Sequence, residues 1–301
     1  MKILVVGSIN MDLVTYVNSL PQRGETTFGS TFMQNPGGKG ANQACAAALL
    51  NGDVTFLGAI GSDDYGKALQ SCLCKCGVKP VLKISKTKPT GCASIIIEED
   101  VHDNRIIVIS GANEEIKEHD IDMHLDLLQD ADIIIMQLEI PLETVEYVAT
   151  LAHKMHKTVI LNPAPGKKLS DNLLTKVDYL TPNETELALL TDLEVNDEES
   201  LAKACDCLLN KGTKNLLITL GSKGVYWCTQ DAKKLIPAFR VDAVDTTAAG
   251  DCFNGAFATF LSEGYEVEKA ILYAQKASSI CVQRKGAIAS LPRREELMIK
   301  N

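Results

Sequence analysis

The sequence lacks any apolar run long enough to cross a membrane. Apolar stretches such as Ile133 to Met136 fall far short of the roughly 20 residues that a spanning helix needs. The first seven residues also lack the long apolar core and the small-residue cleavage site of a secretory signal, and they are typical of a buried strand. We therefore expect no membrane partner and a cytoplasmic protein.

An excess of positive charge is missing as well. The chain has 30 Lys and Arg against 39 Asp and Glu, a formal net charge of −9, and its basic residues are scattered. Proteins that bind nucleic acid concentrate Lys and Arg on one face. Nucleic acid is therefore not an expected partner, and 46% hydrophobic with 23% charged residues indicates an ordinary globular protein.

The chain has ten cysteines but no other feature of a disulfide-stabilised protein, because it is long and well supplied with apolar residues. We expect reduced thiols. Cys72, Cys74 and Cys76 form one cluster that could hold a metal, yet in a helix this spacing turns Cys74 away from the other two. Ordinary helix cysteines are the simpler interpretation, and a metal site is the alternative.

Short strand-like runs alternate with segments of helical period, which predicts a doubly wound, mostly parallel α/β sheet flanked by helices. The predicted strands are Ile3 to Val6, Val54 to Leu57, Ile133 to Met136, Thr158 to Leu161 and Leu216 to Thr219. Two interruptions rich in turn residues, from about residue 12 to 36 and from 81 to 109, predict a small antiparallel β lid. No linker or repeat divides residues 1–301, so we expect a single domain with a lid.

The segment Pro36 to Gln43 places three glycines before an alanine-rich helix. Glycine permits a ligand to approach the backbone closely, but a plain turn into a helix is an equal alternative. The segment is not a P-loop, because its glycine spacing differs and no hydroxyl residue follows Lys39. The loop after the first strand also lacks the dinucleotide fingerprint, which argues against a nicotinamide-dependent dehydrogenase.

A turn of small residues from Ala243 to Gly250 opens a long amphipathic helix. Exposed N–H groups and the helix dipole at such a start can hold a phosphoryl group. Asp251 can accept a proton from an attacking hydroxyl there, or it can simply cap the helix. In the same way, Asn183 and Glu186 have the spacing of a capping box and also the chemistry to hold hydrated magnesium.

Together, the order and spacing of these segments resemble the ribokinase family of sugar kinases from Val6 to about Pro292. The matching segments are Gly7 to Asp12, Gly37 to Ala44, Met136 to Glu139, Leu161 to Pro165, Thr181 to Glu186 and Asp245 to Asp251. The resemblance implies transfer of phosphate from ATP to the 5-hydroxyl of D-ribose, with Mg²⁺ and K⁺ as cofactors. It also implies a homodimer that pairs through the lid edges.

The resemblance assigns roles to particular residues. Asp251 matches the catalytic base, and the N–H groups of Ala249, Gly250 and Asp251 match the anion hole. The positions that match sugar contacts are Asn10, Asp12, Gly38, Lys39, Asn42, Glu139 and Asp251. The positions that match contacts of ATP and its Mg²⁺ are Asn183, Glu186, Thr219, Gly221, Gly224 and Gln275. The positions that match the K⁺ site are Asp245, Thr247, Cys281, Arg284, Gly286 and Ser290.

Two departures and two alternatives remain. Many family members have Gly-Ala-Gly-Asp where this chain has Ala248 to Asp251. In the similar deoxyribose kinases a methionine takes the place of Asn10, so Asn10 favours ribose even though Met11 lies beside it. A kinase for another acceptor (2-deoxyribose, fructose or adenosine) and a non-catalytic sugar-binding protein are the alternatives.

Overall fold

The computed structural model describes residues 1–100 and 103–297. Its strands are β1 (Lys2–Val6), β2 (Asn10–Val17), β3 (Thr31–Gly37), β4 (Asp53–Gly61), β5 (Lys79–Ser85), β6 (Gly91–Glu98), β7 (Asp103–Ile109), β8 (Ile133–Met136), β9 (Thr158–Leu161), β10 (Tyr179–Leu180), β11 (Asn215–Thr219), β12 (Gly224–Cys228) and β13 (Lys233–Pro237). All five strands predicted from the sequence are therefore present.

Helices separate most of the parallel strands of the large sheet. The α-helices are α1 (Lys39–Leu49), α2 (Asp64–Lys75), α3 (Glu118–Asp122), α4 (Leu125–Asp130), α5 (Leu142–Lys154), α6 (Asp171–Leu174), α7 (Glu184–Thr191), α8 (Glu198–Asn210), α9 (Ala249–Ser262) and α10 (Val267–Cys281). The 3₁₀ turns are η1 (Gly111–Glu115), η2 (Gly221–Lys223), η3 (Ile288–Ser290) and η4 (Arg294–Leu297). No helix in the described ranges is both long and apolar enough to cross a bilayer.

A nine-stranded sheet forms the centre of the molecule, in the order β13-β12-β11-β10-β9-β8-β1-β4-β5. Its strands are parallel from β11 to β5, and the two remaining pairs, β11–β12 and β12–β13, are antiparallel, so that β12 alone of these nine strands runs in the opposite direction. This confirms the predicted doubly wound, mostly parallel sheet.

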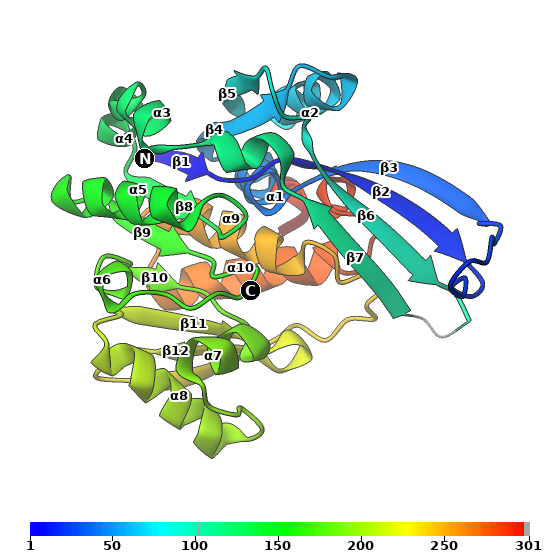
Figure 1. Ribbon diagram of the computed structural model, residues 1–301. Helices are drawn as coiled ribbons and strands as arrows, with labels where there is room; N and C mark the ends of the chain where they lie inside the picture. Colours follow the sequence, from blue (N-terminus) through cyan, green and yellow to red (C-terminus); the bar gives the residue numbers. More distant parts are fainter. Residues whose placement is uncertain (101–102, 298–301) are drawn as a thin grey trace.

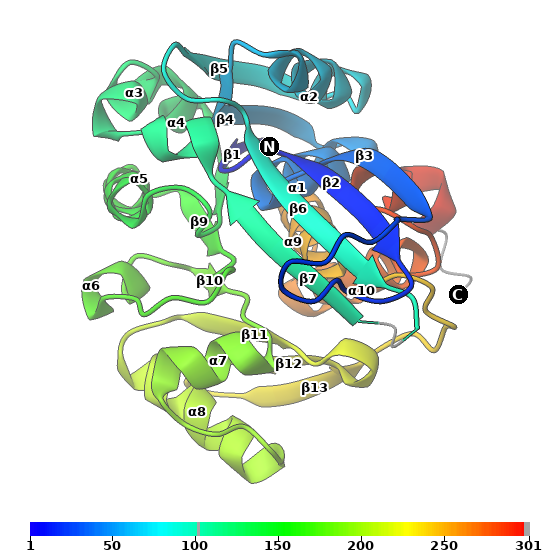
Figure 2. The same cartoon turned by 45° about the vertical axis from the view of Figure 1, so that its right-hand side comes forward.

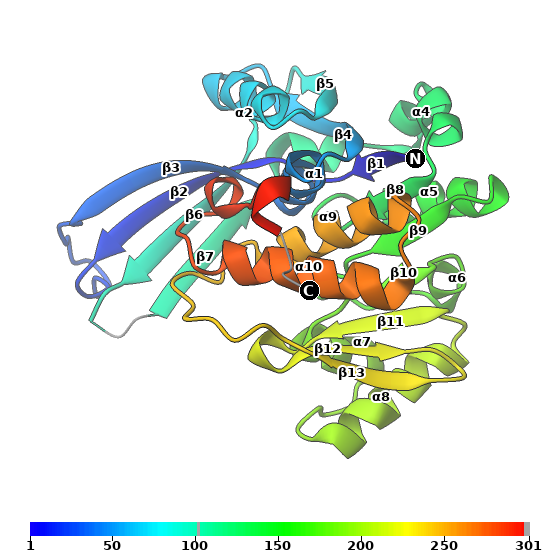
Figure 3. The ribbon, with the colours of Figure 1, turned by 180° about the vertical axis from the view of Figure 1, so that it is seen from behind.

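Alternate residues of each central strand pack against opposite helical layers. In β1, Ile3 and Val5 join the core formed with α1, α2, α9 and α10. Leu4 and Val6 join the core formed with α3 to α8. Figure 1 shows α5, α7 and α8 on one face, and Figure 3 shows α1, α9 and α10 on the other.

A four-stranded sheet, β3-β2-β6-β7, projects from the large sheet and is here called the lid (Figure 2). Two details differ from the sequence prediction. Residues 81–85 lie in β5 and pair with β4 in the large sheet, not in the lid. The sequence did not distinguish the two positions, because an edge strand of the large sheet shows the same alternation of apolar and polar residues as a lid strand. The lid is also mixed rather than antiparallel, since β2 and β6 leave the same edge of the large sheet and run parallel.

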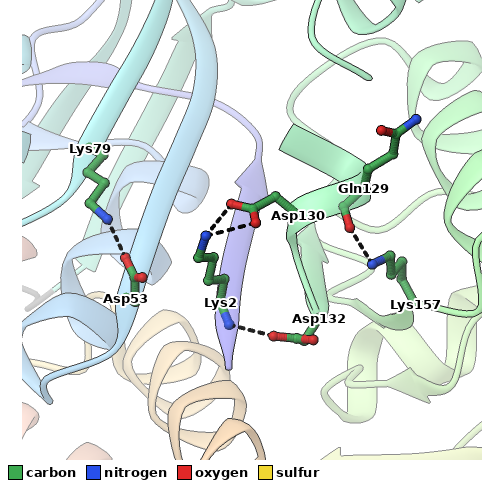
Figure 4. Close-up of polar contacts among 7 residues, drawn as sticks. All are labelled: Lys2, Asp53, Lys79, Gln129, Asp130, Asp132 and Lys157. Carbon is green, nitrogen blue, oxygen red and sulfur yellow. Dashed lines mark hydrogen bonds and ion pairs between the residues drawn. The ribbon is translucent and has the colours of Figure 1, made fainter. Parts of the chain in front are cut away.

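The amino edge of the large sheet is closed by polar contacts between strand and helix ends (Figure 4). The Lys2 ammonium lies 2.8 Å from Asp130 Oδ1, and the Lys2 backbone N–H donates to Asp132 Oδ2 at 2.7 Å. Lys79 pairs with Asp53 at 2.6 Å. These pairs are solvent-exposed, so each contributes little to the stability of the fold. The polar groups that face cavities lie at the opposite, carboxyl edge.

The metal interpretation of Cys72, Cys74 and Cys76 gains no support from the fold. Cys74 is exposed and Cys72 and Cys76 are half-buried on α2 and at its end, and all are free thiols. Contact with Cys45 and burial raise the pKa of Cys76 to about 12, so this sulfur is protonated near neutral pH.

Gly38 precedes α1 with φ of 89°, and a Cβ there would lie 2.6 Å from the Asn10 backbone nitrogen. We predict that Gly38→Ala lowers the free energy of unfolding by about 2 to 4 kcal/mol, the sum of left-handed strain and overpacking. The matched control is Gly264→Ala, where φ is 83° but nothing lies within 4 Å of the added Cβ. In urea unfolding, the control should lose only about 1 to 2 kcal/mol of unfolding free energy. Equal losses in the two variants would contradict close packing of Gly38 against the Asn10 backbone.

Candidate active site

The parallel strands place a row of polar residues at the carboxyl edge of the large sheet. Ser8 follows β1, Gln137 follows β8, Asn162 follows β9 and Thr181 follows β10, and all four are buried. Buried polar groups need partners, and the carboxyl edge of an open parallel sheet is where such folds bind ligands. The site is therefore expected at this edge.

Two cavities open on this edge. The first, about 940 Å³, is called the lid cavity; it is lined by Asn10, Lys39, Asn113, Glu139 and, from β7, Ile106 and Val108. The second, about 780 Å³, is called the loop cavity; among its lining residues are Asn183, Thr219, Gly221, Gly224, Ala249, Gly250 and Gln275. Of the expected sugar contacts, Asn10, Lys39 and Glu139 line the lid cavity, whereas Asp12, Gly38, Asn42 and Asp251 are not among its lining residues. The expected nucleotide positions, with the exception of Glu186, line the loop cavity.

Asp251 lies in the first turn of α9, directly after Gly250 of the loop cavity. Its side chain is buried and accepts two hydrogen bonds from α1, from Asn42 Nδ2 to Oδ2 and from Gln43 Nε2 to Oδ1, both at 2.9 Å. Burial raises the pKa of Asp251 and exceeds the opposing effect of nearby Lys39 and the two amides. A desolvated carboxylate of this kind is a stronger base than an exposed one.

The start of α9 leaves backbone donors available. Ala248 has φ of 59° and makes no side-chain cap, and Asp251 bonds to α1, so the simple capping interpretation of Asp251 does not hold. Within the described ranges, the Ala249 N–H donates to Thr246 O at 3.2 Å, while the N–H groups of Gly250 and Asp251 have no acceptor. Those two N–H groups are positioned to hold an anion.

Lys39 lies among carboxylates. Burial by itself lowers the pKa of Lys39, but the negative charges of Asp251, Glu139 and other acids outweigh it and raise the pKa. Conversely, burial and the neighbouring charges of Glu139 and Asp251 raise the pKa of Asp12 to about 7. Glu139 Oε2 accepts hydrogen bonds from Ser8 Oγ at 2.5 Å and from the Lys39 backbone N–H at 3.1 Å.

Three buried amide oxygens have no partner among the described residues: Asn42 Oδ1, Gln137 Oε1 and Gln275 Oε1. Such acceptors are costly unless a ligand or water satisfies them. Asn42 donates to Asp251 with its nitrogen, which leaves its oxygen for another donor. Gln275 lines the loop cavity and donates to Ile236 O at 3.0 Å, which leaves its oxygen free in the same way.

Asn183 and Glu186 form the reciprocal capping box of α7. Asn183 N donates to Glu186 Oε2 at 2.9 Å, and Glu186 N donates to Asn183 Oδ1 at 2.8 Å. Burial raises the pKa of Glu186. The cap occupies one carboxylate oxygen and leaves Glu186 Oε1 without a bond in the described structure, so capping does not exclude a second role.

The residues that match the K⁺ site come together around Asp245. Its two oxygens accept from the backbone N–H groups of Thr247 and Gly286, each at 2.9 Å. Cys281 Sγ lies 3.0 Å from Ser290 Oγ and 3.8 Å from Thr247 O. The Arg284 guanidinium pairs with Glu296 and has no acceptor atom, so Arg284 can contribute only its backbone carbonyl to a cation site.

Oxygen donors of this kind suit a hard monovalent cation. In the described ranges, no group of three or more His, Cys, Asp or Glu side chains could hold a metal ion. Mg²⁺ commonly binds through one or two carboxylates together with substrate phosphates, so Glu186 fits a magnesium that arrives with a nucleotide.

A chain of buried amides that the sequence interpretation missed supports Asp251. Gln43 Nε2 also donates to Asn162 Oδ1 at 3.1 Å, and Gln137 Nε2 donates to Gln43 Oε1 at 2.7 Å. Asn254 Nδ2 donates to the carbonyl of Gly250 at 2.8 Å. Gln43, Gln137 and Asn162 lie inside the matched segments, which was the available signal, but their pairing is not visible in one sequence.

A buried carboxylate that follows a residue of the loop cavity and interacts with a residue of the lid cavity, together with free N–H groups, is typical of an enzyme that transfers a group from one ligand to another. The model of the pfkB family carbohydrate kinases matches residues 1–294. Ribokinase of Haemophilus influenzae is 42% identical over 295 residues, which cover 98% of this chain and 96% of that protein. Deoxyribokinase of Salmonella typhi is 38% identical over 299 residues, covering 98% and 97%.

Solved structures agree. The structure of Arabidopsis thaliana ribokinase complexed with ribose and ATP matches with a TM-score of 0.91 at 35% identity, covering 98% of this chain and 97% of that one. Ribokinase from Thermotoga maritima matches with a TM-score of 0.90 at 40% identity and the same coverage. The chain therefore belongs to the pfkB family of carbohydrate kinases, which confirms the resemblance and the fold expected from the sequence.

We predict that Gln43→Met lowers the free energy of unfolding by about 2 to 4 kcal/mol, because it leaves buried Gln137 and Asn162 groups without their partner. Urea unfolding measures the change. The matched control is Gln70→Met, on the exposed surface of α2, which should change stability by no more than about 0.5 kcal/mol. A Gln43→Met variant as stable as the control would contradict a connected network.

Proposed function

We propose that this chain transfers the γ-phosphoryl group of ATP to the 5-hydroxyl of D-ribose, giving D-ribose 5-phosphate and ADP. The observation that carries the proposal is the buried Asp251 carboxylate at the start of α9, which follows Gly250 of the loop cavity and interacts with Lys39 of the lid cavity. The relatives named ribokinase, at about 40% identity over nearly the full chain, support ribose as the acceptor.

In this proposal the sugar occupies the lid cavity. Its hydroxyls are held by Asn10, Asp12, Gly38, Lys39, Asn42 and Glu139. These groups include both donors and acceptors, among them the unpartnered Asn42 Oδ1. Lid closure over this cavity would exclude water, with Gly37 and Gly38 as the hinge.

Asp251 takes the proton of the 5-hydroxyl as its oxygen attacks the γ-phosphorus, and the bond from that phosphorus to the ADP oxygen breaks. Negative charge on the transferred group is stabilised by the free N–H groups of Gly250 and Asp251, with Ala249 in the same turn. Lys39, whose raised pKa keeps it charged, supplies positive charge beside Asp251.

ATP occupies the loop cavity in this proposal. Asn183 lies at the triphosphate, Thr219, Gly221 and Gly224 form the nucleotide loop, and Gln275 lines the adenine pocket. Mg²⁺ would be held by the phosphates and, through water, by Glu186, and it would supply charge neutralisation during transfer. A titration with Mg²⁺ that leaves activity unchanged would remove this part of the proposal.

We also propose a K⁺ ion at Asp245, held by carbonyls and hydroxyls of Thr247, Cys281, Arg284, Gly286 and Ser290. Asp245 and Thr247 belong to the turn that leads directly into the first turn of α9, so a cation bound beside them would stabilise the anion hole. Equal activity in K⁺ and in a large organic cation would exclude the site.

The lid edges are proposed to pair in a homodimer. The lid edge strand β7 exposes Ile106, Ile107, Val108 and Ile109, each about half accessible to solvent or more. An exposed apolar edge strand is a template for another strand. Sedimentation velocity at micromolar concentration should give twice the mass of one chain, and a monomer there would contradict the dimer.

The expected site of action is the cytoplasm, where ATP is supplied.

A coupled assay of ADP release with ribose, 2-deoxyribose, fructose and adenosine tests the acceptor. The match to deoxyribokinase makes 2-deoxyribose the second candidate. Preference for ribose is the expected result. Preference for another acceptor would overturn the sugar but keep the Asp251 chemistry, whereas no turnover of any would favour a non-catalytic sugar-binding protein.

We predict that Asp251→Asn lowers kcat by about 100-fold or more, because it removes the group that accepts the proton. The variant should fold normally and bind ATP as tightly as the wild type. Asp231→Asn, on an exposed loop, is the matched control and should keep full activity. Near-normal turnover by Asp251→Asn would remove Asp251 from the mechanism.

We predict that the KM for ribose rises as pH falls from 8 to 6. Asp12 has a raised pKa of about 7, so it is ionised above this pH and protonated below it, and only the ionised form accepts two hydroxyl donors. In Asp12→Asn this change in KM should disappear, leaving a high and constant value. A wild-type KM that stays constant over this range would contradict contact between Asp12 and the sugar.

A further inference from the structure

Asn113 is a buried amide of η1 whose orientation is determined by the backbone. Its Oδ1 accepts from the N–H of Ile9 at 3.0 Å. Its Nδ2 donates to the carbonyls of Ile9 at 3.2 Å and of Ser110 at 2.9 Å. A backbone N–H can only donate and a carbonyl can only accept, so the Asn113 amide cannot be turned over without losing all three bonds.

The fixed Asn113 determines the orientation of Asn10 in turn. Asn113 Nδ2 donates to Asn10 Oδ1 at 2.7 Å, so the atom of Asn10 that faces Asn113 must be its oxygen. Asn10 is buried and lines the lid cavity. With its oxygen occupied, the Asn10 amide has its Nδ2 group left, and the site therefore offers a donor at this position.

Gly91, the first residue of β6, covers this pair of amides. It stands opposite Asn10 in the β2–β6 register. A Cβ on Gly91 would lie 2.2 Å from Asn10 Oδ1 and 2.3 Å from Asn113 Nδ2. The lid backbone thus packs directly on the hydrogen bond between the two amides and leaves neither one room to rotate away.

We propose that Asn113 is a positioning residue for acceptor specificity: it holds Asn10 so that Asn10 Nδ2 donates to a hydroxyl oxygen of the sugar. An acceptor that lacks this hydroxyl leaves a buried N–H unpaired and is disfavoured. The inference rests on the proposed sugar site but not on any role of Asp251. Asn113 also lines the lid cavity, but both ends of its amide are bonded to protein atoms, so in this proposal it acts on the sugar only through Asn10.

A double-mutant cycle separates this role from a merely structural one. The KM for ribose and the KM for ATP are measured for wild type, Asn113→Ala, Asn10→Ala and the double variant. Asn113→Ala should raise the KM for ribose about 10-fold, the value of one well-placed hydrogen bond, and leave the KM for ATP unchanged. In the Asn10→Ala background the same substitution should have less than about a 2-fold effect.

An equal effect of Asn113→Ala in both backgrounds would overturn the proposal, because it would show that Asn113 does not act through Asn10. Asn172→Ala, on the exposed surface of α6, is the matched control and should change neither KM. If wild type turns over no ribose, the proposed acceptor is wrong, and the cycle is run with the sugar that it does accept.

A measurement on the wild-type chain keeps the inference testable if Asn113→Ala does not fold. In ¹⁵N-labelled protein, the side-chain NH₂ signals of Asn10 are identified by their loss in Asn10→Ala. These signals should shift when ribose is added and stay in place when ATP alone is added. No shift with a saturating sugar would overturn the proposal.

Discussion

The two hydrogen bonds from α1 to the Asp251 carboxylate are the interaction on which the rest of the site depends. They join residues 208 and 209 positions apart in the chain, and they hold a buried negative charge at the start of α9. An unpaired carboxylate at this depth would be protonated or would disrupt the packing. Asn42 and Gln43 therefore allow one position to be both buried and basic, which a proton acceptor in phosphoryl transfer needs.

Close packing of α1 and α9 makes these bonds possible. Gly255 lies so near α1 that a Cβ there would meet the carbonyl of Gln43 at 2.4 Å. The two helices belong to one hydrophobic core, to which α1 contributes Ala44 and Ala47 and α9 contributes Ala256 and its phenylalanines. Small side chains on both helices bring the backbones together, and the polar residues of their first turns then meet over the sheet edge.

Much of the fold could be predicted from the sequence because buried parallel strands are short, apolar and separated by helical periods. The lid was predicted less well, since the half-buried β5 has the same alternation as a lid strand and only its pairing with β4 distinguishes it. Motifs of glycine, Asp and Asn identified Asp251, Lys39 and Asn183 as candidate site residues. The resemblance to the family then assigned each of them a role in phosphoryl transfer or ligand binding.

The amides that orient the site could not be predicted. A buried Asn or Gln has the same one-letter signature as an exposed one, and its function depends on partners about a hundred residues away in the chain, as between Asn10 and Asn113. The strain at Ala248 was also hidden, since the departure from Gly-Ala-Gly-Asp is visible but its positive φ is not. The capping box at Asn183 and Glu186 leaves Asn183 in the wall of the loop cavity, so capping does not exclude the predicted role in ligand binding.

The short connection from β1 to β2 has a mechanical consequence. Only residues 7–9 separate the central strand of the large sheet from the lid strand that bears Asp12. The lid is therefore joined to the large sheet at the wall of the lid cavity, where Asn10 lies, and Asp12 follows two residues farther along β2. Rotation of the lid would carry the Asp12 carboxylate with it, so under the proposed function opening of the lid and release of the sugar would be coupled.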